Sequence, residues 1–223
     1  GFNYDIDADG IVTVTMDMEG PVNSMNEEYR QCMADTVQKL QGEEGLAGVV
    51  LASAKKVFFA GGNLHELLAT TEDDIPGFMD VMHRTKAELR ALEKLPVPVV
   101  AAINGAALGG GFEICLSCNH RIAWNNRSVQ LGLPVVRMVN LLGLQTALPY
   151  LLEGTRVTPE KALAAGMIHE TVDTFEELVP RAKAWILENK DNADAAVQPW
   201  DVKGFKIPGG NAAHPANAQM ISV

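Results

Sequence analysis

At the start of the chain, apolar and polar residues alternate as they do in a β-strand. Tyr4 and its neighbours alternate with polar residues, and Asp9-Gly10 is a strong turn signal before a second alternating run. Two later runs are apolar and β-branched without polar alternation, which indicates strands buried on both faces. The predicted strands are residues 4–7, 11–16, 49–52, 97–103, 121–124 and 128–131.

Helical periods alternate with these strands. Asn26 can cap a helix with Tyr29, Met33, Val37 and Leu40 on one face. Thr158 and Pro159 indicate another helix start, and Thr174-Phe-Glu-Glu177 is a capping box. Helices are predicted after Asn26, through Leu67 and Leu68, over 76–95, from near Gly110, after Val135, from Pro159 to Gly166, and from Thr174 through Trp185. In the helix over 76–95, the apolar positions include Phe78, Met82 and Leu89.

Strands alternating with helices predict an α/β fold. Residues 1–190 carry all of these elements and form the predicted catalytic core. From residue 191 to 223, Asp, Asn, Ala, Pro and Gly dominate, so we expect a loop-rich tail or linker with Trp200 and Phe205 docking on the core.

Composition narrows the classes of function. A hydrophobic content of 47% and a charged content of 21% are typical of a soluble globular protein, and a net charge of −10 argues against nucleic acid or an anionic membrane as the partner. We see no signal peptide and no membrane span, and three cysteines suit a reducing cytoplasm. Cys115 and Cys118 fall inside a predicted helix and are expected to be small buried residues. The five histidines lack zinc spacing, so no metal site is predicted.

The most informative stretch is the strand at 97–103 with the turn and helix that follow it. Asn104-Gly105 breaks the strand, and three glycines at 109–111 open a helix. The first N–H groups of a helix lack intrahelical partners and lie at its positive end. Glu113 follows one turn later and leans back over them. The arrangement fits chemistry beside a carbonyl, or glycines that only allow tight packing of helix on strand.

Two motifs resemble the fingerprints of the enoyl-CoA hydratase/isomerase (crotonase) family. They are Asn-Gly-Ala-Ala-Leu-Gly-Gly-Gly-Phe-Glu at 104–113 and Val-Phe-Phe-Ala-Gly-Gly-Asn-Leu at 57–64. The resemblance extends from residue 11 to 189 and implies a spiral of ββα units. The tail is similar to the connection that follows the hydratase part of multifunctional fatty-acid-oxidation proteins.

The resemblance implies a site for acyl-CoA thioesters. The N–H groups of Gly62 and Gly110 would form the oxyanion hole, and Glu113 would be the catalytic acid/base. The substrate would be held by Lys56, Phe58, Ala60, Gly62, Leu64 and Gly110. CoA is part of the substrate, so no cofactor is expected, and the protein would be a homo-oligomer (a trimer or a multiple of one) or part of a larger multifunctional chain.

The chain departs from the family where the second catalytic glutamate is expected. That glutamate follows Gly-x-Pro and precedes a glycine-rich stretch, but here Gly132-Leu-Pro134 runs directly into Val-Val-Arg-Met. Either the stretch is truly deleted, or its residues were not seen in a crystal; we favour the second interpretation because glycine-rich functional loops concentrate disorder. Asn63 also replaces the usual aspartate.

The leading hypothesis is an enoyl-CoA hydratase that adds water to a 2-trans-enoyl-CoA to give a 3-hydroxyacyl-CoA in β-oxidation. An enoyl-CoA isomerase or a thioester hydrolase of the same fold is favoured if the second glutamate is absent. A catalytically silent domain that serves assembly is the alternative from another class.

Overall fold

The computed structural model describes residues 1–62, 68, 71–133, 136–211, 214–215 and 217 of the chain. The chain is continuous over its 223 residues. The interpretation that a stretch after Pro134 had escaped a crystal structure is therefore wrong. That stretch is missing from this chain.

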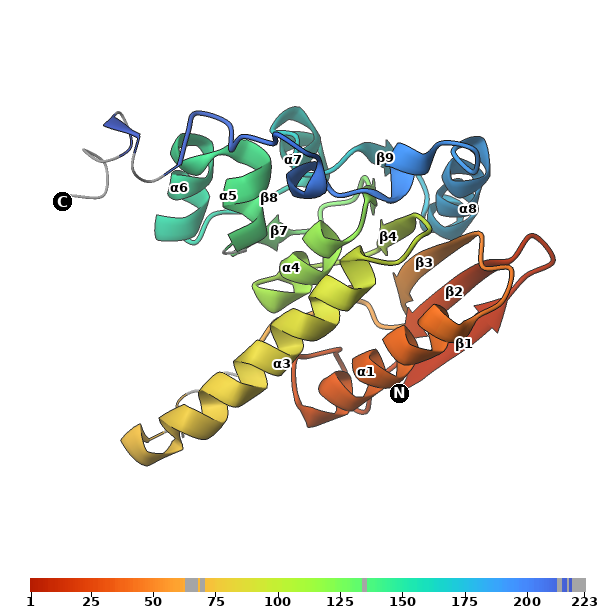
Figure 1. Cartoon of the computed structure of the whole chain (residues 1–223), viewed down its shortest axis with the longest axis horizontal. Helices are drawn as coiled ribbons and strands as arrows, with labels where there is room; N and C mark the ends of the chain where they lie inside the picture. Colours follow the sequence, from red (N-terminus) through yellow and green to blue (C-terminus); the bar gives the residue numbers. More distant parts are fainter. Residues whose placement is uncertain (63–67, 69–70, 134–135, 212–213, 216, 218–223) are drawn as a thin grey trace.

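The strands form two sheets (Figure 1). The larger has the order β1-β2-β3-β4-β6-β9, in which β1 is antiparallel to β2 and all the other pairs are parallel. The smaller has the order β5-β7-β8. The strands are β1 (Phe2–Ile6), β2 (Ile11–Met16), β3 (Gly48–Ser53), β4 (Val99–Ile103), β5 (Ala107–Leu108), β6 (His120–Trp124), β7 (Leu131–Gly132), β8 (Arg156–Val157) and β9 (Glu170–Val172).

Helices follow the strands in a repeated order. In β4-β5-α4 and β6-β7-α5, one strand joins each sheet before the chain turns into a helix, so the predicted ββα spiral is confirmed. The α-helices are α1 (Glu27–Gly42), α3 (Ile75–Glu93), α4 (Gly110–Ser117), α5 (Val136–Leu142), α6 (Leu144–Leu152), α7 (Pro159–Ala164) and α8 (Leu178–Glu188), and the 3-10 turns are η1 (Glu72–Asp74), η2 (Phe175–Glu177), η3 (Ala193–Ala196) and η4 (Pro199–Asp201).

Both faces of the main sheet are buried, because successive side chains of a strand point to opposite faces. Val49 and Leu51 belong to the large core that also contains residues of α1, α3 and α4. Val50 instead packs in a second cluster with Leu178 and Ile186 of α8. The apolar runs without alternation are thus strands between two layers of helices, as the sequence predicts.

Several helix starts follow their capping signals. The Asn26 side chain accepts a hydrogen bond from the Tyr29 N–H at 3.0 Å. The box at Thr174 and Glu177 also forms, although it opens η2 before α8 begins. Thr158 is a correction, since its side chain makes no capping hydrogen bond and only its carbonyl accepts from Ala162.

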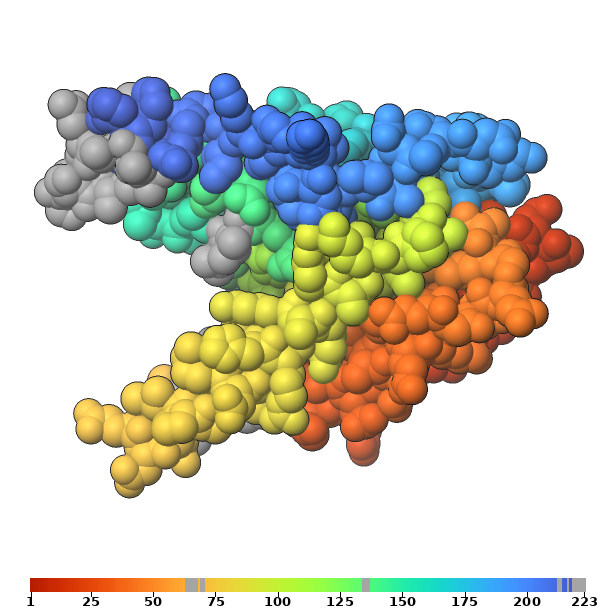
Figure 2. Space-filling view, in the orientation of Figure 1, coloured from red at the N-terminus to blue at the C-terminus, as the bar shows by residue number. Residues whose placement is uncertain are grey.

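Two other expectations are wrong. The strand predicted at 128–131 shrinks to Leu131–Gly132, because Asn126 accepts hydrogen bonds from both the N–H and the hydroxyl of Ser128 and makes a turn there. Phe78 does not pack in the core and is 37% exposed. The first half of α3 projects from the body of the molecule (Figure 2). The helix predicted through Leu67 lies outside the described residues.

The tail docks on the core through polar contacts. Gln198 donates to the Ser117 carbonyl at the end of α4 at 2.7 Å. Asp201 forms ion pairs with Arg90 and Lys94 of α3. Trp200 and Phe205 are half-buried. No helix in the described part of the chain is long and apolar enough to cross a membrane.

A stack of rings joins β6, β9 and α8. The His120 ring lies 4.5 Å from the His169 ring and 4.1 Å from the Trp185 ring, both nearly parallel to it. Its Nε2 is 2.9 Å from Glu170 Oε1, and the side chain is buried. Burial lowers the pKa of His120 from 6.5, and the positive charges of Arg121 and Arg181 lower it further. Glu170 acts in the opposite direction but does not outweigh them.

We predict that this buried imidazole makes stability depend on pH. Since His120 binds a proton less readily in the folded than in the unfolded chain, the free energy of unfolding should fall as pH drops below 6.5, by at most about 1.4 kcal/mol per pH unit for one proton. The stacked His169, whose pKa is lowered to about 3, adds a slope of the same sign. Urea melts from pH 7.5 to 5 should therefore show a fall in stability in the wild type and a shallower one in His120→Gln. The exposed His83→Gln should keep the wild-type slope. Equal slopes in all three proteins would remove His120 as the cause.

Candidate active site

The two glycine-rich motifs lie against each other. The Phe59 N–H donates to the Ala106 carbonyl at 3.0 Å, and the Leu108 N–H donates to the Phe59 carbonyl at 3.2 Å. A Cβ on Gly111 would lie 2.5 Å from the Phe59 oxygen, and one on Gly61 would lie 2.6 Å from the Leu108 oxygen. Tight packing therefore explains these two glycines.

Packing does not explain Gly62 and Gly110. A Cβ on Gly62 would meet nothing within 4 Å, and one on Gly110 would meet only the flexible end of Met25. Met25 also pairs with Gly62 in an isolated β-bridge, in which its N–H donates to the Gly61 carbonyl. Met25 thus lies beside both predicted oxyanion donors.

The N–H groups of these two glycines are the predicted oxyanion donors. Gly110 is the first residue of α4, so its N–H has no intrahelical acceptor. Neither it nor the Gly62 N–H donates to an acceptor within the described segments. Gly109, with φ of +53°, turns the chain from β5 into α4 in a backbone conformation that glycine adopts readily. The two motifs thus present two amides beside one side chain.

Glu113 stands in the first turn of α4 and takes part in an ion-pair network. Its Oε2 is 3.0 Å from Nη1 of Arg137 on α5, and its side chain is 14% exposed. The Arg137 Nε lies 2.6 Å from Oε1 of the buried Glu93 on α3. Burial lowers the pKa of Arg137, but its hydrogen bonds to Glu93 and Glu113 outweigh this and raise it. The network joins three helices around the predicted acid/base.

The predicted substrate-binding residues are placed unevenly. Lys56, Ala60 and Gly62 are exposed, whereas the Phe58 side chain is fully buried in the core. Phe58 can therefore meet a ligand only through rearrangement or through its backbone. Leu64 lies outside the described residues.

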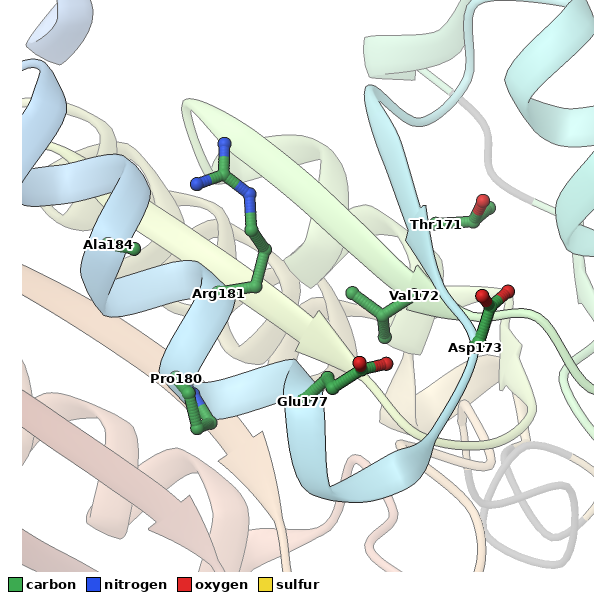
Figure 3. Close-up of a pocket in the computed structure, with 7 residues that line it drawn as sticks. All are labelled: Thr171, Val172, Asp173, Glu177, Pro180, Arg181 and Ala184. Atoms are coloured by element: carbon green, nitrogen blue, oxygen red, sulfur yellow. The ribbon is translucent and has the colours of Figure 1, made fainter.

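A cavity of about 430 Å³ lies beside the motif at 57–64. It is lined by Ser53, Ala54, Lys55, Lys56, Asn104, Trp124, Ser128 and Phe175. The Lys55 ammonium is held 2.7 Å from Asp17, while Lys56 has no ion pair among the residues the structure describes. A second depression, of about 470 Å³, lies between β9 and α8 (Figure 3). It contains no residue of either motif, and Arg181 at its edge is occupied by Glu170 and Glu188.

Sequence reasoning missed two residues that build the site. Asn23 is fully buried, and its amide donates to the carbonyls of Met16 and Phe58 and to the Ser53 hydroxyl. Asn23 therefore fixes the motif at 57–64 on the sheet. No local signal distinguishes it from a turn residue after Gly20-Pro21. Arg137 was missed because its partners are 24 and 44 residues away in sequence. A cation inside an otherwise uncharged helix was its only signal.

The site has no second carboxylate at the expected sequence position. Only three residues, 133–135, connect β7 to α5, and none is acidic. Two of them, Pro134 and Val135, lie outside the described residues.

The cysteines take no part in this chemistry. Cys115 and Cys118 are fully buried in α4 and just after it, and burial raises the pKa of the Cys118 thiol to about 12. They are small apolar residues here, as expected. Among the described residues, no group of His, Cys, Asp and Glu is arranged to hold a metal ion.

Comparisons with known proteins show the family of the chain. Residues 7–200 match the family model described as enoyl-CoA hydratase/isomerase. The fatty acid oxidation complex subunit alpha of Shewanella halifaxensis is 33% identical over 184 residues, which are 77% of this chain and 26% of that protein. That of Shewanella frigidimarina is 32% identical over 203 residues, 82% of this chain and 28% of that protein. The chain thus spans about a quarter of the length of these relatives.

Solved structures show the same fold. The enoyl-CoA hydratase of Bacillus halodurans superposes with a TM-score of 0.77 at 25% identity, covering 87% of this chain and 82% of that one. The enoyl-CoA hydratase of Bacillus anthracis superposes with a TM-score of 0.75 at 25% identity, covering 86% of this chain and 77% of that one.

Proposed function

Because the chain belongs to the enoyl-CoA hydratase/isomerase family, we propose that it binds an enoyl-CoA thioester and transfers a proton beside the thioester carbonyl. The observation that carries this proposal is the grouping of one carboxylate with two amides that have no acceptor among the described residues. Gly62 and Gly110 flank Met25, and Glu113 lies one turn after Gly110.

Hydration of a 2-trans-enoyl-CoA is the first candidate reaction. Glu113 would take a proton from water as the water oxygen bonds to C3 of the thioester. The electron pair would move onto the carbonyl oxygen, where the N–H groups of Gly62 and Gly110 would stabilise the negative charge. Protonation of C2 would then give the 3-hydroxyacyl-CoA.

Isomerisation of a 3-enoyl-CoA is the second candidate, favoured by a specific observation. The connection from β7 to α5 carries no acidic residue, so one carboxylate of the expected pair is missing. Moving the double bond needs only one carboxylate, which accepts a proton from C2 and gives a proton to C4. Hydration must in addition orient a water molecule.

Product analysis of the wild type separates the candidates. The protein is incubated with a 2-trans-enoyl-CoA and, separately, with the matching 3-enoyl-CoA, and the thioesters are resolved by chromatography. We expect 3-hydroxyacyl-CoA from the first, 2-enoyl-CoA from the second, or both. A folded protein that converts neither substrate would support the silent assembly domain instead.

The relatives' name suggests the setting of this reaction. We propose that the domain works in fatty acid β-oxidation in the cytoplasm, either as a homo-oligomer or within a larger multifunctional chain. The proposal rests on the relatives being subunits of a fatty acid oxidation complex and on three cysteines without a disulfide among the described residues.

We expect Lys55 and Lys56, which precede the motif at 57–64, to bind CoA. Free CoA should raise the melting temperature by mass action, and Lys55→Glu with Lys56→Glu should weaken this, because both line the same cavity. If the two residues are only solvated surface lysines, CoA affinity will not change.

The tail offers a control with the same change in charge. Lys203→Glu with Lys206→Glu alters two exposed lysines that do not line the cavity. Thermal melts over a CoA titration should show wild-type affinity in this variant and reduced affinity in the Lys55 and Lys56 variant. Equal affinities in the two variants would contradict the assignment.

A further inference from the structure

Arg137, which follows the position of the missing stretch in the sequence, contacts the predicted acid/base Glu113. β7 ends at Gly132, and α5 begins only four residues later, at Val136. The short connection leaves the second residue of α5 against α4, where Arg137 Nη1 contacts Glu113 Oε2 at 3.0 Å. A cation therefore contacts the acid/base in a site where the resemblance implies a second carboxylate.

The guanidinium is held from behind. Its Nε lies 2.6 Å from Glu93 Oε1, and the Glu93 side chain is only 2% exposed. The other Glu93 oxygen accepts from Arg90 at 2.8 Å, and Arg90 is itself paired with Asp201 in the docked tail. Because the fork of an arginine is planar, a guanidinium fixed at Nε points its Nη1 in a defined direction. Glu93 thus fixes the direction in which the guanidinium meets Glu113, whereas Arg90 holds only the other oxygen of Glu93.

A guanidinium in this place affects the two candidate reactions differently. It has five N–H donors and no acceptor. Activating water for attack on C3 requires groups that accept the hydrogen atoms of water, whereas a donor occupies its lone pairs. A carboxylate hydrogen-bonded to a fixed guanidinium is held in one orientation, which suits it to accept a proton from one defined carbon.

We propose that Arg137 is a positioning residue that directs Glu113 toward proton transfer between carbon atoms rather than hydration. The inference rests on the proposed function and deepens it, naming a 3-enoyl-CoA as the preferred substrate class. Glu113 accepts a proton from C2, the electron pair forms a dienolate whose oxygen is held by Gly62 and Gly110, and the carboxylic acid of Glu113 gives a proton to C4. No proton, electron pair or co-reactant is gained or lost.

The test compares rates for both substrates in the wild type, Arg137→Gln, Arg137→Lys and Arg90→Gln. Arg90 is the matched control, because it shares Glu93 with Arg137 but makes no contact with Glu113. Both kcat and KM are measured for isomerisation and hydration, and thermal melts establish that each variant is folded.

We expect the wild type to isomerise faster than it hydrates. Arg137→Gln should lower kcat for isomerisation about tenfold or more while KM stays within about threefold, and the ratio of isomerisation to hydration should fall. Arg137→Lys should recover part of that ratio, and Arg90→Gln should leave it unchanged. The lysine variant also serves if the glutamine variant does not fold.

Three results would overturn the inference. A ratio within about twofold of wild type in a folded Arg137→Gln removes Arg137 from the reaction. An equal fall in Arg90→Gln means that the network only stabilises the fold. A wild type that converts neither thioester refutes the proposed function itself, and with it the role of Arg137.

Discussion

Glu113→Gln should lower the turnover of an enoyl-CoA thioester by about 10²–10⁴-fold, which is the usual contribution of a positioned acid or base. Glutamine keeps the shape of the side chain and an oxygen that can accept from Arg137 at the position of Oε2. The thioester would still be held by the amides of Gly62 and Gly110. Affinity for the acyl-CoA should therefore change little while kcat falls.

The competing explanation is that Glu113 only complements the positive end of α4, which is worth about 0.3–1 kcal/mol. Its substitution would then cost a little stability and leave turnover almost intact. Glu160 provides the control, since it stands exposed in the first turn of α7. Glu160→Gln should retain wild-type turnover. A stable Glu113→Gln with the wild-type rate would remove Glu113 from the mechanism.

Gly110→Pro should also abolish most turnover, because proline deletes the N–H that is assigned to the oxyanion. Removing one such donor typically costs about 10²–10³-fold in kcat, or roughly 3–4 kcal/mol. Gly110 is the first residue of α4, a position where proline is tolerated, so the protein should still fold. Circular dichroism and thermal melts check the fold, and the assay with both thioesters checks the rate.

Gly110→Ala separates the lost donor from the added bulk. Alanine keeps the N–H, and its Cβ would lie 2.7 Å from Met25 Cε, the end of a side chain that can move. We therefore expect the alanine variant to be far more active than the proline variant. Equal loss in both would attribute the effect to crowding beside Met25, and near-normal activity in a folded Gly110→Pro would refute the oxyanion assignment.

The sequence predicted the parts of the site that are local. The strand, turn and glycine-opened helix at 97–117 lie within one stretch, and their conformations follow from β-branched runs and from glycines that adopt positive φ. Glu113 could be identified because its spacing from Gly110 is fixed by the turn of the helix. That the two glycine motifs meet at one site followed from the family resemblance alone.

What the sequence could not predict depends on distant contacts. Asn23 and Arg137 act through partners up to 44 residues away, and neither stands in a recognisable motif. Phe78 follows the helical period of α3, but the period does not say how far the body of the protein extends beneath the helix. The turn at Asn126 overrode the strand pattern at 128–131 through side-chain hydrogen bonds.

Incorporation of deuterium tests the central claim most directly, because hydration protonates C2 and isomerisation protonates C4, both through Glu113. The wild type and Glu113→Gln are incubated with a 2-trans-enoyl-CoA and a 3-enoyl-CoA in heavy water, and label at C2 and C4 is measured by mass spectrometry at equal protein concentration. The account predicts label at C2 of the hydration product, at C4 of the isomerisation product, or both in the wild type, and a rate lower by about 10²–10⁴-fold in the variant. The same rate of labelling in both proteins, or none in the folded wild type, would contradict it.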